Sequence, residues 1–98
     1  MYNRLREDLF DWDEANISHI ARHRIAPEDA EHVLLNDPVD GGTQDHAGEQ
    51  RSINVGVTAA MRVLVVITTW RNERLRVVTA YPASPSARAF YQSERRSK

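Results

Sequence analysis

The sequence contains no cysteine, which excludes disulfide bonds and cysteine-based metal sites as sources of stability. It also lacks a long hydrophobic run: the longest unbroken apolar stretch, Val63 to Ile67, is far shorter than the roughly 18 residues of a membrane-spanning helix. The first residues, MYNRLRED, mix charges of both signs and do not form a signal peptide. We therefore expect a cytoplasmic protein whose stability comes from side-chain packing, either alone or with the help of a partner.

The chain has 98 residues, of which 41% are hydrophobic, and this is enough for one core. A domain of this size buries only about two-thirds of the surface that its unfolded chain exposes. We expect a single domain over residues 1–98, with its core between about residues 10 and 92 and a frayed tail over residues 93–98.

Lysine is almost absent, because 12 of the 13 basic residues are arginine. The planar guanidinium group can hold a phosphate with two parallel hydrogen bonds. The charges are divided along the chain: residues 1–50 carry 4 Arg and 12 acidic residues (net −8), and residues 51–98 carry 9 basic and 2 acidic residues (net +7). This asymmetry predicts either a phosphate-facing surface in the second half or ion pairs between the two halves.

Two helices are predicted in the acidic half. Apolar residues recur every three to four positions over residues 13–23, which predicts a helix with Asp11 or Asp13 as its N-cap. Pro27 begins a second helix, which ends before the Asp37-Pro38 pair.

Two aromatic residues, Phe10 and Trp12, precede the first of these helices. Acidic side chains flank both of them. We expect them to anchor the helical half on the sheet.

The basic half predicts three strands, over residues 51–57, 62–69 and 75–80. The second has five consecutive apolar residues, which is typical of a central strand buried on both faces. Both connections are too short for a parallel crossover, so we expect sequential antiparallel pairing. Residues 39–49 are polar and glycine-rich and are expected to form a loop, and Ser84 caps a short last helix. The predicted fold is α+β: two N-terminal helices, a three-stranded antiparallel meander and a short C-terminal helix.

Several segments of the chain together resemble one known family. They are WDEANISHIARHRIAPEDAEHVLLNDP (Trp12 to Pro38), Glu49-x-Arg51, Gly56 with Thr58, Arg62-x-Leu64-x-Val66, Thr69-x-Arg71 and Arg76 to Ala80. In this order and spacing they resemble the BrnT family of ribonuclease toxins from type II toxin–antitoxin systems. The resemblance covers about residues 10–92.

The resemblance implies a compact ribonuclease related in fold to RelE-type toxins. It also implies a cognate antitoxin of the ribbon-helix-helix type that forms a hetero-oligomer with the toxin, so that DNA is contacted only through the antitoxin. Three positions depart from the family pattern. Tyr81 replaces a usual Arg, Arg24 replaces a usual Gly, and the segment Ser84 to Ala89 carries only Arg88 where members have an Arg- and Lys-rich helix.

RNA cleavage without a metal needs a base for the ribose 2′-hydroxyl, cations for the charge on the phosphorane and an acid for the leaving 5′-oxygen. The catalytic candidates, which supply a base, an acid and cations, are Glu49, Arg62, Arg76 and Tyr81. The RNA-binding candidates are Arg51, Trp70, Arg71 and Arg88. Trp70 is expected to stack on a splayed base at the end of a strand.

Each candidate also has an ordinary structural interpretation. An arginine at a strand end can be a solvated edge residue. Glu49 can form an ion pair with Arg51, Tyr81 can pack with its hydroxyl in water, and Trp70 can cover the core.

His19 and His23 lie four residues apart on the first helix, a spacing that can bind a metal. Because no third ligand lies nearby in the sequence, the pair indicates a polar helix face or a surface packed against a partner. We expect no cofactor.

The main alternative to a ribonuclease is a catalytically inactive BrnT-like domain for protein interaction, which the changes at Tyr81 and in the last helix favour. Direct DNA binding is less favoured, since no predicted helix has a basic recognition face.

Overall fold

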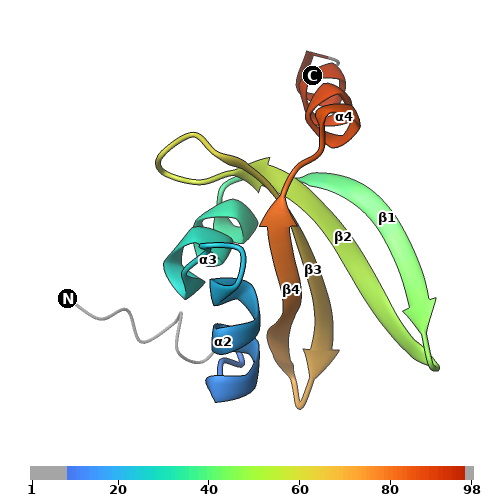
Figure 1. Cartoon of the computed structure of the whole chain (residues 1–98). Helices are drawn as coiled ribbons and strands as arrows, with labels where there is room; N and C mark the ends of the chain where they lie inside the picture. The colour runs from blue at the N-terminus through green and yellow to red at the C-terminus, as the bar shows by residue number, and fades with distance from the viewer. Residues whose placement is uncertain (1–8, 97–98) are drawn as a thin grey trace.

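The computed structural model describes residues 9–96. Its helices are α2 (Glu14–Ala21), α3 (Pro27–Leu35) and α4 (Pro85–Arg96). Its strands are β1 (Val39–His46), β2 (Glu49–Val57), β3 (Val63–Arg71) and β4 (Arg74–Pro82). The strands form one sheet in the order β1-β2-β3-β4, and every neighbouring pair is antiparallel (Figure 1).

The prediction of a three-stranded meander is wrong, because residues 39–46 form a fourth strand where a loop was expected. β1 pairs with β2 from Val39↔Val55 to His46↔Glu49, with a bulge between Asp40 and Thr43. Only Val39 of this strand is buried, so the usual alternation of apolar residues is missing. Backbone hydrogen bonds to β2 form the strand in spite of its loop-like composition.

The other predicted elements are present, and sequential antiparallel pairing of the three expected strands is confirmed. α2 lies within residues 13–23, and Asp13 is its N-cap, in a reciprocal capping box with Asn16. β3 is flanked by β2 and β4 and has buried side chains on both faces, as its apolar run predicts.

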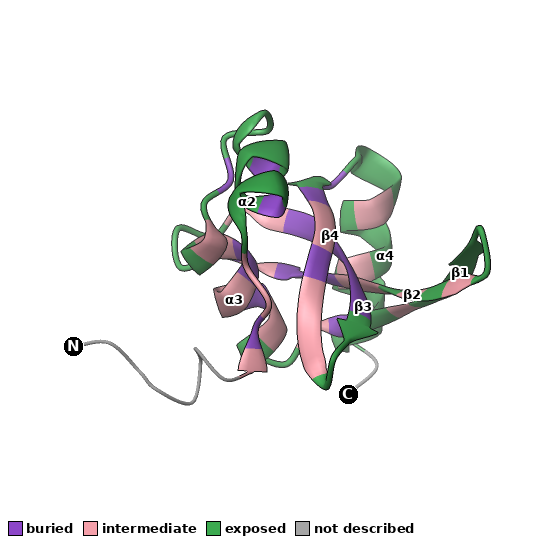
Figure 2. Ribbon diagram, turned by 90° about the horizontal axis from the view of Figure 1, so that it is seen from below, coloured by how far each residue is buried: buried purple, intermediate pink, exposed green. Residues whose placement is uncertain are grey.

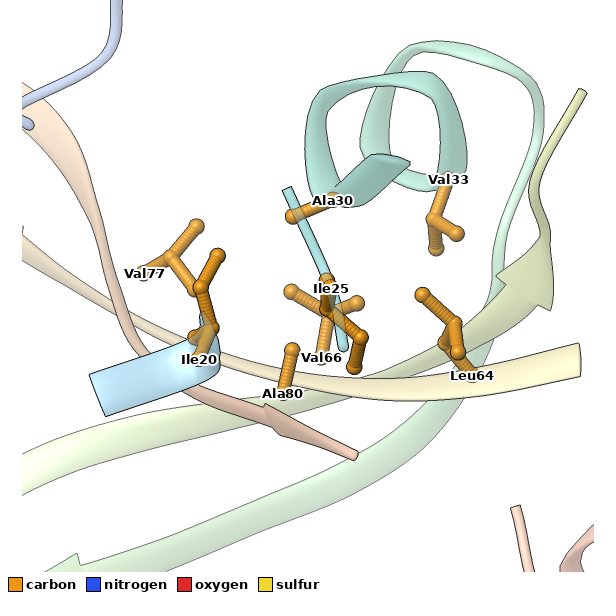
Figure 3. Packing of buried hydrophobic residues seen from close by; sticks show 8 residues of the cluster. All are labelled: Ile20, Ile25, Ala30, Val33, Leu64, Val66, Val77 and Ala80. Atoms are coloured by element: carbon orange, nitrogen blue, oxygen red, sulfur yellow. The ribbon is translucent and has the colours of Figure 1, made fainter. Parts of the chain in front are cut away.

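Helices cover both faces of the sheet, with α2 and α3 on one side and α4 on the other (Figure 2). The main core lies beneath α2 and α3 and consists of Ile20, Ile25, Ala30, Val33, Leu64, Val66, Val77 and Ala80 (Figure 3). A smaller cluster on the α4 side consists of Val55, Val65, Ile67 and Ala83, with Ala87 and Tyr91 of α4 packed against it. Burial of these two faces supplies the main driving force for folding.

Gly56 allows α3 to approach the sheet closely. A Cβ atom at this position would lie 2.9 Å from Cγ1 of Val33, which is fully buried in the main core. Any larger residue would therefore push α3 away from β2.

The segment before α2 is fastened to the free edge of β4. Phe10 is 2% exposed and forms a parallel bridge with Leu75, and the Asp11 N–H donates to the Leu75 carbonyl over 2.9 Å. The Trp12 indole Nε1 donates to Glu31 Oε2 of α3 over 2.8 Å. The expected anchoring role of Phe10 and Trp12 is confirmed, and it brings the acidic residues that flank them to the sheet.

The last helix begins as expected, because the Ala87 N–H donates to Ser84 Oγ over 3.2 Å. It continues through residues 93–96, where fraying was expected, and Arg95 Nη1 there lies 2.8 Å from Asp37 Oδ2. Among the helices of residues 9–96, none has the length and apolar character needed to span a membrane.

Candidate active site

A cleft of about 270 Å³ is lined by residues of α2 and of strands β2, β3 and β4. Its strand residues lie on the face of the sheet that α4 covers, and α2 borders the cleft. Four of its lining residues are predicted site residues: Glu49, Arg51, Arg71 and Arg76. The remaining lining residues are Ala15, Asn16, His19 and Val78.

Strand register explains why these charged side chains meet. Ser52 pairs with Thr68 and Thr69 pairs with Arg76, so Arg51 and Arg76 flank Thr69 in one row across the sheet. Side chains two residues apart in a strand point to the same face, so Glu49 shares this face with Arg51, and Arg71 shares it with Thr69. The cluster therefore requires β2, β3 and β4 to be in register.

A β-bulge in β4 changes which of its residues share this face. Thr68 pairs with Val77 and Ile67 pairs with Thr79, so Val78 is an extra residue without a partner in β3. Arg76 and Thr79 are three residues apart and would point to opposite faces of a regular strand. The bulge brings both to the cleft face.

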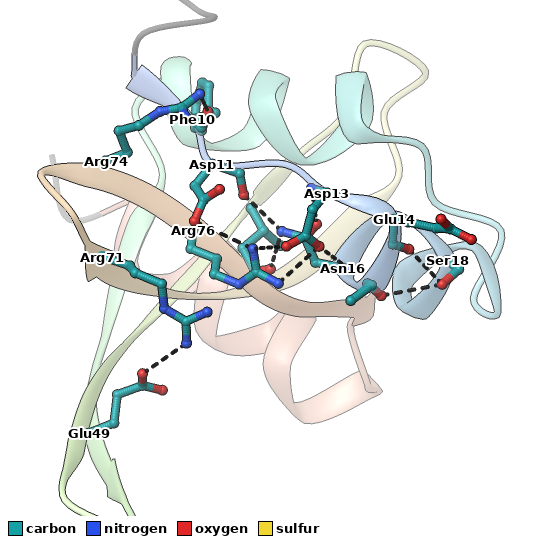
Figure 4. Close-up of polar contacts among 12 residues, drawn as sticks. Phe10, Asp11, Asp13, Glu14, Asn16, Ser18, Glu49, Arg71, Arg74 and Arg76 are labelled. Atoms are coloured by element: carbon teal, nitrogen blue, oxygen red, sulfur yellow. Dashed lines mark hydrogen bonds and ion pairs between the residues drawn. The ribbon is translucent and has the colours of Figure 1, made fainter.

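Glu49 connects two arginines from neighbouring strands. Its Oε1 lies 2.9 Å from Arg51 Nε and its Oε2 lies 3.5 Å from Arg71 Nη2 (Figure 4 shows the second contact). The hydrogen bond from Arg51 is the main reason that the pKa of Glu49 is lowered below its ordinary value of 4.5. Glu49 is therefore a carboxylate at neutral pH and can accept a proton but not donate one.

Arg76 is held from the side of the N-terminal segment (Figure 4). Its Nη1 and Nη2 donate to the two carboxylate oxygens of Asp13 over 2.9 and 3.1 Å, and Nη1 lies 3.4 Å from Asp11 Oδ2. The hydrogen bonds that Arg76 donates, above all those to Asp13, raise the pKa of Arg76 above its ordinary value, and the same contact lowers the pKa of Asp13 below 3.8. Only 11% of the Arg76 side chain is exposed. Arg76 lines the cleft, and its contacts with Asp11 and Asp13 also fasten the N-terminal segment to β4.

His19 is a cleft residue that sequence reasoning did not assign to catalysis. Its Nε2 lies 3.1 Å from Thr79 Oγ1, and its side chain is exposed beside the three arginines. The signal was its spacing from His23, which was interpreted as a weak metal pattern. His23 instead contacts the ring of Tyr81, with ring centroids 6.4 Å apart.

The other four predicted site residues lie outside the lining of this cleft. Arg62 lies before β3 and its Nη1 donates to the Arg24 carbonyl over 3.0 Å, while Tyr81 contacts His23. Trp70 is 66% exposed, but it precedes Arg71 in β3 and so projects from the opposite face. Arg88 is exposed on α4.

No group of three or more His, Asp and Glu side chains within residues 9–96 is arranged to hold a metal ion. The charged groups of the cleft pair across the two halves of the sequence. Arg51, Arg71 and Arg76 belong to the basic half, and their carboxylate partners Glu49, Asp11 and Asp13 belong to the acidic half. These ion pairs between the two halves are one of the two outcomes that the charge asymmetry predicts.

The fold and the cleft define a class of small α+β proteins in which one sheet face carries several arginines in a cleft. A family model described as "Ribonuclease toxin, BrnT, of type II toxin-antitoxin system" matches residues 12–86. The chain therefore belongs to the BrnT family of type II ribonuclease toxins, as its sequence motifs indicate. A comparison with curated proteins gave no match.

Proposed function

We propose that this protein cleaves RNA in the cleft, without a metal ion, by attack of a ribose 2′-hydroxyl on the adjacent phosphate. The observation that carries the proposal is that three arginines and an ionised carboxylate line one cleft. Glu49 takes the proton of the 2′-hydroxyl, and Arg51 and Arg71 bind the phosphate and stabilise its growing charge. Arg76 forms the third cationic wall.

The test is cleavage of short single-stranded RNAs by the purified protein in the presence of EDTA. Wild-type protein is expected to produce fragments that end in a 2′,3′-cyclic phosphate and a 5′-hydroxyl. Glu49→Gln and Arg71→Ala are each expected to slow cleavage by about a hundredfold, since each removes a charge that acts in the transition state.

Arg22→Ala is the matched control, because Arg22 is an exposed arginine outside the cleft lining. It is expected to cleave at the wild-type rate. If the wild-type protein leaves every RNA intact in EDTA, the proposal fails.

A binding domain without catalysis is the second candidate. The observation that favours it is that Arg51, Arg71 and Arg76 each already contact a carboxylate of the chain itself. A phosphate must displace these carboxylates or bind beside them. Specific RNA or protein binding without any cleavage would support this candidate.

We further propose that an antitoxin of the ribbon-helix-helix type neutralises the protein in the cytoplasm by covering the cleft with an acidic segment. The two proteins then form a hetero-oligomer, which contacts DNA through the antitoxin. Opposite charges accelerate association at low salt. Arg71→Glu is expected to slow antitoxin association in stopped-flow measurements, and Arg22→Glu to have little effect. Equal rates for the wild type and Arg71→Glu would show that the antitoxin covers another surface.

A further inference from the structure

Glu49 and the three arginines supply the cleft with a base and with cations, but RNA cleavage also needs an acid for the leaving oxygen. Glu49 is ionised, and arginine does not lose its proton in proteins. Alanine and valine have no proton to give, and the amide of Asn16 already donates to the carbonyls of Asp11 and Val77. Among the lining residues of the cleft, this leaves His19.

We propose that His19 is the general acid of RNA cleavage and that Thr79 is a positioning residue for it, an inference that rests on the function proposed above. An imidazole can hold and release a proton near neutral pH. His19 stands on α2, while Glu49 stands on β2, so the two proton-transfer groups occupy different walls of the cleft.

Two local features of the fold hold His19 in place. Asn16, one turn earlier in α2, is 3% exposed and donates to the Val77 carbonyl over 3.1 Å, which fixes the helix against β4. The bulge at Val78 brings the Thr79 hydroxyl to the cleft face, where it lies 3.1 Å from His19 Nε2. In the protonated imidazole, Nε2–H donates to Thr79 and Nδ1–H remains for the substrate.

The proposed cleavage is a single transesterification in which one proton is taken up and one is released. The 2′-oxygen forms a bond to phosphorus as Glu49 takes its proton, and the bond from phosphorus to the 5′-oxygen breaks as His19 Nδ1 gives its proton to that oxygen. The products are a 2′,3′-cyclic phosphate and a 5′-hydroxyl. Protons then return through water, and no oxidant, metal or co-reactant is needed.

The experiment compares His19→Gln with His23→Gln in single-turnover cleavage of one RNA in EDTA. His19→Gln is expected to lose about 10²- to 10³-fold in rate, and His23→Gln to stay within about twofold of the wild type. Glutamine can still form a hydrogen bond but cannot give up a proton at neutral pH. The charged groups that line the cleft with His19 are Glu49, Arg51, Arg71 and Arg76, and all four remain in both variants.

A substrate with sulfur in place of the bridging 5′-oxygen separates acid catalysis from a structural role, because a thiolate leaves without being protonated. On this substrate His19→Gln is expected to approach the wild-type rate, whereas Glu49→Gln stays slow. A His19→Gln variant that cleaves the natural RNA as fast as the wild type would overturn the inference, as would an equal loss on both substrates. If wild-type protein cleaves neither, the proposed function fails as well.

Thr79 has its own test. Thr79→Val removes the hydroxyl and keeps the shape, so kcat is expected to fall about tenfold with KM unchanged. Thr79→Ser keeps the hydroxyl and is expected to restore most of the rate. A change of KM alone, or a Ser variant as slow as the Val variant, would exclude the positioning role.

Discussion

At the scale of single residues, Asn16 joins the N-terminal segment, α2 and β4. Its Nδ2 donates to the carbonyls of Asp11 (3.0 Å) and Val77 (3.1 Å), and its Oδ1 accepts from the Asp13 N–H (2.8 Å). A buried amide with all of these partners fixes one arrangement of the surrounding backbone.

Asn16→Ala is expected to lower the free energy of unfolding by about 2–3 kcal/mol, because it leaves buried backbone groups without partners. Urea denaturation measures this difference. Ser18→Ala on the exposed side of the same helix is the control, with an expected change below about 0.5 kcal/mol. Equal stability of Asn16→Ala and wild type would show that water replaces the lost hydrogen bonds.

Asp13 links stability to pH through its contact with Arg76. Asparagine caps a helix as well as aspartate does, so Asp13→Asn keeps the N-cap and removes the charge. The pKa of Asp13 in the folded protein is lowered below 3.8, so its stabilisation is present above about pH 3.8 and is lost as the pH falls through the folded-state pKa.

The wild type is therefore expected to be more stable than Asp13→Asn at neutral pH, and the difference is expected to disappear in acid. Urea denaturation at a series of pH values between 7 and about 2.5 measures it. A difference that stays constant over this range would mean that the charge of Asp13 does not contribute.

At the scale of elements, α2 ends in a Schellman motif in which Arg24 occupies the position that requires a positive φ. The Ile25 N–H donates to the Ile20 carbonyl (3.3 Å) and the Arg24 N–H donates to the Ala21 carbonyl (3.0 Å). Arg24 has φ +60°, in the left-handed region that glycine adopts without steric cost. The turn forms nevertheless, and the Arg24 carbonyl accepts a hydrogen bond from Arg62.

Arg24→Gly is expected to stabilise the protein by about 1 kcal/mol, because glycine adopts a positive φ without steric cost and the carbonyl that Arg62 uses is retained. Thermal or urea denaturation measures the gain. Arg22→Gly is the control: Arg22 has φ −60°, so glycine is expected to destabilise there. A loss of stability in Arg24→Gly would show that the arginine side chain itself contributes.

At the scale of the whole molecule, ion pairs neutralise part of the opposite charge of the two halves. Besides the pairs in the cleft, Arg95 of α4 pairs with Asp37 after α3. Exposed ion pairs of this kind contribute little each to stability. For the proposed binding of RNA, their larger effect is to reduce the net positive charge that the cleft offers to the phosphates.

We therefore expect a modest salt dependence of RNA binding. Each phosphate neutralised on a single strand contributes about 0.7 to the slope of log K against log salt, so a contact with the three arginines gives a slope of about −2. Titration of a non-cleavable RNA from about 50 to 300 mM salt measures it. A slope steeper than about −4 would mean that arginines outside the cleft bind RNA too.

The sequence by itself determined both N-terminal helices, three of the four strands, their pairing order and the family. The elements and their pairing order follow from local signals: caps, prolines, apolar periodicity and connection length. The family follows from the order and spacing of the sequence motifs. β1 could not be predicted, because its polar, glycine-rich residues are a strand only through hydrogen bonds to β2.

The tertiary structure decided which site candidates meet. Arg51 lies 20 residues or more before Arg71 and Arg76 in the sequence, and the three share a face only through strand register. Arg62 and Tyr81 carry equally suitable groups but lie outside the cleft lining. His19 joins the site because α2 packs along β4 and a bulge turns Thr79 toward it, and neither feature has a local sequence signal. Residue types determine which chemistry is available, but the long-range backbone pairing that brings side chains together depends on the whole fold.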